Sequence, residues 1–250
     1  MTHAITMNDS ANAILAVGAS PTMASHPKEV EEITGAADSL VVNLGNINEE
    51  RLQAMAIAGA RAHALGLPIL LDAVGAACST LRLEYAKAFI AANQPQIIKG
   101  NSSEIRALCG LPSHAHGVDA GSADAIRGTD LAGAAEPFAA YAREHDTVLL
   151  ITGATDLVTD GRRTLGVANG TPLLGRITGT GCMVGALAGT WHSSGEPFAA
   201  AVLGTVYMGL AGEVAARGNP GPGTFHVHLL DALGSLTPDQ VVQGMKIIQA

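Results

Sequence analysis

Four short apolar segments divide the first 153 residues of this sequence, and helix-like segments separate each of them from the next. The apolar segments read SLVVNLG (39–45), LPILLDAVG (67–75), PQIIKGN (95–101) and DTVLLITG (146–153). Runs of this length, bounded by turn residues, are typical of buried strands, and helices between such strands favour parallel pairing. Residues 1–250 are therefore expected to form a single α/β domain around a mostly parallel sheet.

Helical patterns account for most of the remaining chain. Helices are expected at residues 8–18, 27–37, 48–66, 81–93, 102–110 and 131–145, and from residue 180 to the end. A hairpin is expected over residues 156–170, turning at Asp160-Gly161, because Asp-Gly is a frequent two-residue hairpin turn. Residues 114–130 are expected to form a mobile loop.

The composition argues against nucleic acid and membranes as partners. Charged residues make up only 14% of the chain, against a usual quarter, and the net charge is −8. No cluster of Lys and Arg is present, so nucleic acid is not an expected partner. The uncharged run from Pro197 to Gly212 is shorter than the ~20 residues that cross a membrane. The low charge indicates that other subunits cover some of the apolar surface.

The cysteines and the first residues indicate a compartment. Cys78, Cys109 and Cys182 are odd in number and widely spaced, which favours neither a disulfide framework nor a zinc site. Residues 1–21 lack a basic stretch followed by a clean apolar core, so they do not read as a secretion signal. A reducing cytoplasm is the expected location.

Polar residues follow the predicted strands at the points where the strands end. These residues are Asn43, Asp72, Lys99, Asn101 and Thr152. In parallel sheets flanked by helices, ligands bind at the carboxyl ends of the strands. This edge of the sheet is therefore the expected ligand site.

The segment RITGTGCMVGALAG (176–189) places a Gly-rich turn at the start of a helix. Unpaired backbone N–H groups and the helix dipole favour anions there, so Gly179, Thr180, Gly181 and Cys182 form a candidate anion hole. The spacing matches neither the dinucleotide-binding fingerprint nor a Walker A loop. The alternative is a Gly-rich helix start that serves only close packing.

Cys182 lies in the first turn of that predicted helix. A lowered thiol pKa is expected at this position, which makes Cys182 a candidate proton acceptor. A buried and unreactive cysteine is the alternative.

Asp72 and Glu104 are candidate ligands of Mg²⁺, directly or through water, because this ion prefers sparse oxygen ligands together with phosphate. The alternative for Glu104 is a capping box with Asn101 at the start of a helix. Asp156 and Asp160 are better explained by the hairpin.

The nine histidines form no convincing catalytic or metal-binding set. His114 and His116 lie in the predicted loop, and His226 and His228 alternate within TFHVHLL. Surface and packing roles are expected for them.

Several stretches together resemble the hydroxyethylthiazole kinase family of thiamin salvage. They occur in the family's order over nearly the whole chain. They are TMNDSANAILAVGASPTMA, LVVNLGN, PILLDAVG, IIKGNSSEI, GVDA, VLLITGATDLVTDG, RITGTGCMVGALAG and GPGTFHVHLLDAL. The resemblance implies the ribokinase-like fold, a three-layer α/β/α sandwich, and a homotrimer with active sites between subunits.

The resemblance also implies a reaction and a set of roles. ATP would phosphorylate the primary alcohol of 4-methyl-5-(2-hydroxyethyl)thiazole, with Mg²⁺ organised by Asp72 and Glu104 and with Cys182 as the proton acceptor. In the remaining roles implied by the family pattern, Met23 and Gly179 would contact the thiazole, and Lys99 and Thr152 would contact ATP.

The sequence departs from the family pattern in four places. Its first strand is expected to be shortened or missing, with His3 where Asn is usual, which affects the sheet edge and the thiazole pocket. Lys99 stands in place of Arg and would lose bidentate phosphate contact. Ala73 stands in place of Pro, which would loosen the turn beside Asp72, and Asn46 in place of Thr.

Three other functions compete with this one. The first is another ribokinase-like kinase acting on a pyrimidine, pyridoxal or a sugar, which the Cys at position 182 disfavours. The second is a non-catalytic thiazole-binding relative. The third is a thiol hydrolase with Cys182 as nucleophile, which requires a nearby His and an orienting acid.

Overall fold

The protein folds around one seven-stranded sheet, and the computed structural model describes residues 1–115, 117–121, 124 and 131–249. The strands follow each other across the sheet in sequence order. The four strands β1 to β4 pair in parallel, and β4 to β7 pair antiparallel. The strands are β1 (Leu40–Asn43), β2 (Ile69–Asp72), β3 (Ile97–Asn101), β4 (Val148–Thr152), β5 (Asp156–Thr159), β6 (Thr164–Val167) and β7 (Ile247–Gln249).

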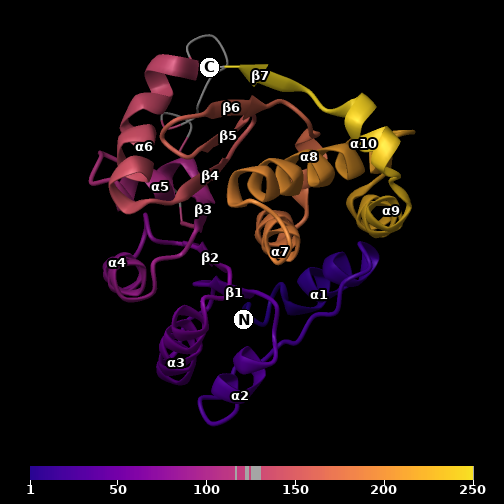
Figure 1. The fold of residues 1–250 in the computed structure, drawn as a ribbon. Coiled ribbons are helices and arrows are strands. Elements are labelled where there is room, and N and C mark those ends of the chain that lie inside the picture. Colours follow the sequence, from indigo (N-terminus) through magenta and orange to yellow (C-terminus); the bar gives the residue numbers. More distant parts are fainter. Residues whose placement is uncertain (116, 122–123, 125–130, 250) are drawn as a thin grey trace.

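Helices cover both faces of this sheet, so the molecule has three layers (Figure 1). One face carries α2 (Val30–Gly35), α3 (Glu49–Leu65), α4 (Thr80–Asn93), α5 (Ser102–Leu108) and α6 (Leu131–His145). The other face carries α1 (Met7–Ala16), α7 (Thr180–His192), α8 (Pro197–Ala215), α9 (Pro222–Ser235) and α10 (Pro238–Gly244). A 3₁₀ turn, Pro172–Arg176, precedes α7. The predicted α/β/α architecture is confirmed.

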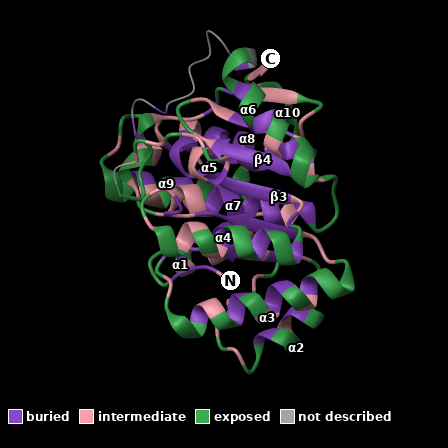
Figure 2. Ribbon diagram, turned by 90° about the vertical axis from the view of Figure 1, so that its left-hand side faces the viewer, coloured by how far each residue is buried: buried purple, intermediate pink, exposed green. Residues whose placement is uncertain are grey.

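Two apolar cores lie on either side of the sheet. Every residue of β2 is buried, and buried residues line the inner faces of the helices on both sides (Figure 2). Burial on both faces explains why these strands read as continuous apolar runs rather than as alternating ones. The central strands therefore hold their carboxyl ends in fixed positions.

Most predicted boundaries agree with the structure. The expected hairpin is present as β5 and β6, with Asp160 N–H bonded to the Arg163 carbonyl. Helices dominate after residue 180, as predicted, and one short strand, β7, follows them and pairs with β6. That strand has three residues and no flanking turn signal. Part of the predicted mobile loop 114–130 lies outside the described residues.

Helix α8 is long and apolar enough to cross a membrane by length and composition alone. It packs between α7 and α9, and two thirds of its apolar window is buried inside the protein. This agrees with the prediction of a buried core helix.

The first residues run beside β1 at the edge of the sheet. The Met1 amine donates to the Val41 carbonyl at 2.7 Å, and Asn43 N–H donates to the Met1 carbonyl at 3.1 Å. The Arg51 guanidinium donates to the Thr2 carbonyl at 2.6 Å. Residues 1–6 form no strand, but this segment pairs with the sheet edge through these bonds.

Helix α7 approaches the sheet closely because small residues face it. A Cβ at Gly185 would lie 3.2 Å from the Asp72 carboxylate, and a Cβ at Gly189 would overlap the Val41 side chain in β1. On the opposite side, a Cβ at Gly204 of α8 would lie 2.8 Å from Ala188. The GALAG segment (185–189) therefore packs α7 closely against the sheet and against α8.

Gly189→Ala is expected to lower the free energy of unfolding by about 1–3 kcal/mol, the usual cost of overpacking. The matched control is Gly223→Ala in α9, where a Cβ would meet no atom within 4 Å. Urea denaturation of both variants measures the difference. A Gly189→Ala protein as stable as the control would show that α7 does not depend on this close approach.

Candidate active site

The carboxyl ends of β1, β2 and β3 place three polar side chains in contact. Asp72 and Lys99 are direct register partners, and the Lys99 Nζ lies 3.1 Å from Asp72 Oδ1 and 3.2 Å from Oδ2. Asn43 Nδ2 donates to Asp72 Oδ2 at 2.9 Å. All three side chains are buried. Parallel register therefore brings together residues that are far apart in the sequence, as the strand-end pattern predicts.

Glu104 closes this group from the start of α5. Its Oε2 accepts from Asn101 N–H at 2.7 Å while Asn101 Oδ1 accepts from Glu104 N–H, so the predicted capping box is present. Its Oε1 accepts from Gly75 N–H at 2.7 Å, which ties the β2 turn to α5. Glu104 is thus a structural cap whose buried carboxylate also lines the site.

The burial of these charges shifts their pKa values. Burial disfavours the Lys99 ammonium, but Asp72, Cys182 and Glu104 outweigh it and raise the Lys99 pKa to about 12. Burial raises the pKa of Asp72, against the opposing effect of Lys99. Burial also raises the pKa of Glu104 to about 7, although Lys99 and two backbone N–H groups favour its ionised form. Lys99 is therefore a permanent cation in this group.

The Gly-rich start of α7 lies directly over Lys99. The helix has Gly179 as its N-cap at φ 89°, and no side chain caps its first N–H groups. A Cβ at Gly181 would lie 3.4 Å from Lys99 Nζ, so the ammonium sits beneath the turn. Free N–H groups, the helix dipole and a buried cation all favour an anion at this turn, as the segment Gly179–Cys182 predicts.

The pKa of the Cys182 thiol differs from the sequence-based expectation. Burial and the Asp72 carboxylate raise the pKa of the Cys182 thiol, and Lys99 only partly opposes them. The prediction of a lowered pKa is therefore wrong, because burial at this site outweighs the favourable position in the first helical turn. Cys182 is a neutral thiol near neutral pH.

Cys182 also has a histidine neighbour that the sequence did not indicate. The Cys182 Sγ lies 3.5 Å from His3 Nε2, and Thr6 Oγ1 lies 3.1 Å from the same nitrogen. No local pattern indicates this contact, because 179 residues separate His3 from Cys182. No described residue hydrogen-bonds the other ring nitrogen, so this pair has no orienting acid of the kind a thiol hydrolase uses.

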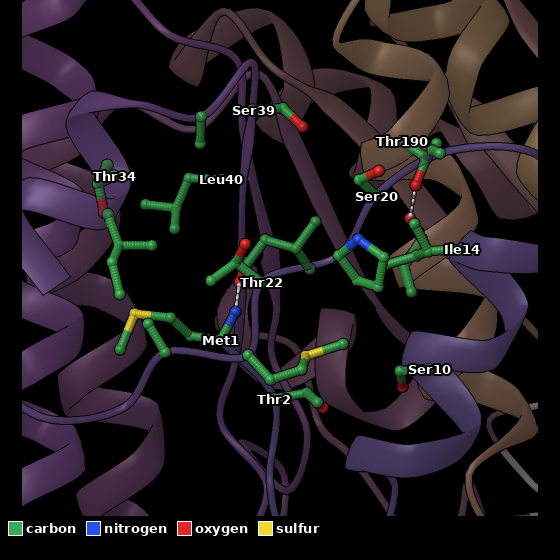
Figure 3. A pocket seen from close by; sticks show the side chains of 18 of the residues that line it. Met1, Thr2, Ser10, Ile14, Ser20, Thr22, Thr34, Ser39, Leu40 and Thr190 are labelled. Carbon is green, nitrogen blue, oxygen red and sulfur yellow. Dashed lines mark hydrogen bonds between the residues drawn. The ribbon is translucent and has the colours of Figure 1, made fainter.

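Two cavities meet at Cys182. The first, of about 640 Å³, lies between the loop after α1, the edge strand β1 and α7. Apolar side chains such as Ile14, Leu40 and Met23 line it together with hydroxyl groups (Figure 3). The second, of about 810 Å³, lies over the carboxyl ends of β3 and β4 and the start of α7. Both volumes are typical of small-molecule sites.

The structure distributes the predicted site residues between the two cavities. Met23 lines the first cavity and Gly179 the second, so the two residues predicted to contact the thiazole do not line one cavity within this chain. Lys99, Thr152 and Glu104 line the second cavity. Asp72 lies buried beneath the cavities, and Cys182 alone among the predicted residues lines both.

Asp156 is a further site residue that the sequence analysis assigned to the hairpin only. It lines the second cavity, and its Oδ1 accepts from Gly153 N–H at 2.8 Å. Burial raises its pKa to about 7, against the effects of this hydrogen bond and of Lys99. Its place at the start of β5 gave no signal, because a turn aspartate has the same local sequence.

Two departures from the family pattern have structural explanations. Ala73 N–H donates to the Lys99 carbonyl at 2.8 Å, a bond that proline could not form. This bond ties the turn beside Asp72 to β3. Asn46 has φ 41°, a left-handed conformation that Asn tolerates better than a β-branched Thr.

The donor set near Asp72 and Glu104 suits a hydrated Mg²⁺. The described residues contain no group of three His, Cys, Asp or Glu side chains placed to hold a metal. Both oxygens of each carboxylate already accept a hydrogen bond. Mg²⁺ retains several waters and takes few carboxylates when phosphates are present, so contact through water fits this site better than a protein cage.

Comparison with known proteins identifies the family. The sequence pattern of the hydroxyethylthiazole kinase family matches residues 1–239. The chain belongs to the hydroxyethylthiazole kinase family. It is 42% identical to a hydroxyethylthiazole kinase of Desulfotalea psychrophila over 99% of this chain and 88% of the relative.

Solved structures place the family within a wider fold group. The hydroxyethylthiazole kinase of Pyrococcus horikoshii OT3 superposes with a TM-score of 0.88 at 37% identity, covering 100% of this chain and 91% of that one. A Staphylococcus aureus pyridoxal kinase bound to AMP-PCP and pyridoxal has a TM-score of 0.62 at 14% identity, covering 98% and 93%. The second likeness shows the ribokinase-like fold alone, as predicted.

Glu104→Gln is expected to flatten the pH dependence of stability. The Glu104 pKa is raised from 4.5 to about 7 in the fold, so its contribution to stability is full at low pH and is lost as the pH rises to about 7. The melting temperature of the ligand-free protein should therefore fall between pH 5 and pH 8, and fall less in the variant. The amide oxygen of Gln can still accept from Asn101 N–H and so keep the capping box, but the bond from Gly75 N–H is lost.

The matched control is the same change at the exposed Glu144, which should keep the wild-type slope. Because the pKa of Asp156 is also raised to about 7, this residue preserves part of the pH dependence of the melting temperature in both variants. Equal slopes in wild type and Glu104→Gln would contradict the raised pKa.

Proposed function

We propose that this protein transfers the γ-phosphoryl group of ATP to the primary alcohol of 4-methyl-5-(2-hydroxyethyl)thiazole, a step of thiamin salvage. Family membership supports the class of reaction. The single observation that carries the proposal is Cys182, which lines an apolar cavity on one side and the anion-binding turn on the other. An alcohol in the first cavity and a phosphate in the second would meet at this residue.

The first cavity suits a small heteroaromatic ring. Its walls combine apolar side chains with hydroxyl groups, and Met23 supplies a flexible apolar contact that fits irregular shapes. A ring bound there would direct its hydroxyethyl arm towards Cys182. Gly179 would contact the arm from the opposite side of that residue.

The second cavity suits the nucleotide. The N–H groups at the start of α7 and the Lys99 ammonium would bind the phosphates, and Thr152 would contact ATP at the end of β4. Lys99 offers one compact charge in place of a bidentate guanidinium, and its ion pair with Asp72 holds that charge in place.

Catalysis would depend on positioning and charge stabilisation. The substrate oxygen attacks the γ-phosphorus while the bond to the leaving ADP oxygen breaks, and the turn at Gly179–Cys182 stabilises the negative charge on the transferred group. Cys182 orients the hydroxyl and passes on its proton, taking up the hydroxyl proton as it releases its own. Mg²⁺, held by Asp72 and Glu104 through water, would supply neutralisation of the phosphate charge.

The assembly and location belong to the same proposal. A cytoplasmic homotrimer with sites between subunits would explain the low charge of the surface, and a neighbouring subunit would add residues to a site whose two predicted thiazole contacts line different cavities.

The direct test measures ADP release by the purified protein with ATP, Mg²⁺ and the thiazole alcohol. Turnover should require all three. Pyridoxal, a hydroxymethylpyrimidine and ribose serve as comparison substrates. Preference for one of them would favour the alternative ribokinase-like kinase, and thiazole binding without turnover would favour a non-catalytic relative.

Cys182→Ala is expected to lower kcat by about 100-fold, within the usual range for loss of a proton-transfer group, while ATP still binds. Cys182→Asp should retain more activity than Cys182→Ala because a carboxylate also accepts the proton. Steady-state kinetics and ATP titration measure both. A folded Cys182→Asp protein no better than Cys182→Ala would contradict the proton-acceptor role.

Met23→Trp is expected to raise KM for the thiazole by about tenfold or more, because a larger ring would occupy the first cavity. The ATP affinity should stay within about twofold, since Met23 does not line the second cavity. Val242→Trp at an exposed site of α10 is the matched control. Equal effects on the two substrates would show that the cavities are assigned wrongly.

A further inference from the structure

His3 approaches Cys182 through a gap that a side chain at position 45 would fill. A Cβ at Gly45 would overlap the His3 ring, so only glycine permits this placement. The ring is 6% exposed, and its Nε2 lies 3.5 Å from Cys182 Sγ and 3.1 Å from Thr6 Oγ1. The contact is therefore built into the fold by residues from three parts of the chain.

The surroundings of His3 favour its neutral form. Burial, Arg51 and Arg82 lower the pKa of His3, with the Asn46 side chain acting in the opposite direction. The buried amine of Met1 lies two residues away, and its own pKa is lowered to about 5. These surroundings make His3 a neutral imidazole near pH 7.

Cys182 is also neutral, and this limits what it can do alone. Burial and Asp72 raise its pKa, against the effect of Lys99. A neutral thiol cannot take up the substrate proton unless it releases its own. The atom placed to receive that second proton is His3 Nε2.

We propose that Cys182 and His3 form a proton relay, in which His3 is the final acceptor of the hydroxyl proton. The substrate O–H bond breaks as its oxygen bonds the γ-phosphorus, and this proton bonds Sγ. The former thiol proton bonds His3 Nε2, and the electron pair of the broken P–O bond leaves with ADP. The imidazolium then loses its proton to water after product release. This inference rests on the proposed kinase activity.

The relay requires the imidazole tautomer that carries its proton on Nδ1, so that the Nε2 lone pair faces Cys182. The low basicity of His3 suits a temporary acceptor, because its imidazolium returns the proton readily. His3 acts through Cys182 and does not touch the reacting phosphorus, so it is a positioning and proton-uptake residue.

His3→Gln tests the relay through the pH profile. Glutamine retains hydrogen bonding but cannot take up the proton, so kcat should fall about 10- to 100-fold. The pKa of His3 is lowered, so the wild-type rate should decline at acid pH as His3 becomes protonated, and this part of the decline should be absent from the variant. Protonation of Glu104 and Asp156 should affect wild type and variant equally. A variant with the wild-type pH profile would overturn the proposal.

Thr6→Val is the matched control. It removes the other hydrogen bond to the same nitrogen while it preserves side-chain shape and the imidazole. Its pH profile should keep the acid decline. Loss of that decline in Thr6→Val would show that local structure, and not proton uptake by His3, sets the profile.

A double-mutant cycle separates the relay from a structural role. In the Cys182→Asp background the carboxylate accepts the proton directly, so adding His3→Gln should cost less than about threefold. The same loss in both backgrounds would mean that His3 only supports the fold, and would overturn the relay.

Alkylation distinguishes failure of the relay from failure of the proposed function. At pH 7 iodoacetamide should modify Cys182 several-fold more slowly in His3→Gln than in wild type, while the exposed Cys78 reacts equally in both. Slower alkylation in a protein without thiazole kinase turnover would leave the thiol–imidazole coupling intact and refute the function alone. Unchanged alkylation of Cys182 would overturn the relay.

Discussion

The buried ion pair between Asp72 and Lys99 is the interaction on which the rest of the site depends. The two residues are register partners on adjacent parallel strands, and both are almost fully enclosed. Removing one partner of such a pair typically costs about 3–5 kcal/mol, because the other charge is left buried and alone. The pair therefore constrains everything packed around it, including the Asn43 amide and the glycine face of α7.

This constraint explains the unusual electrostatics of the neighbouring groups. Lys99 is buried among Asp72, Glu104, Asp156 and Cys182, and Arg82 also lines the second cavity. Burial disfavours the charged form of each acid, and Lys99 compensates only in part. The three carboxyl groups outnumber these two cations, which makes a hydrated divalent cation a physically suitable addition.

The same constraint organises the two cavities. Helix α7 can lie close to β1 and β2 only because glycines face these strands, and this closeness brings Cys182 between the two cavities. The close packing of small residues in α7 thus also positions the turn that we propose to bind phosphate.

The sequence by itself determined the class of fold, the strand ends that carry polar residues, the anion-binding turn and the family. These features depend on local patterns, such as apolar runs, caps and glycine-rich turns, which remain visible without long-range contacts. The ordered family motifs added the reaction and the roles that we propose for Cys182, Asp72 and Glu104.

Only the tertiary structure decided the contacts and the protonation states. The neighbour of Cys182 is His3, 179 residues away, and no local pattern encodes a contact at that separation. The cysteine's raised pKa follows from burial and from Asp72 on a distant strand, neither of which is visible in the TGTGC segment. Likewise Asp156 has the sequence of a turn residue and becomes part of a cavity only when β5 pairs with β4. Burial and long-range charge are properties of the folded chain, and they determine how these residues titrate.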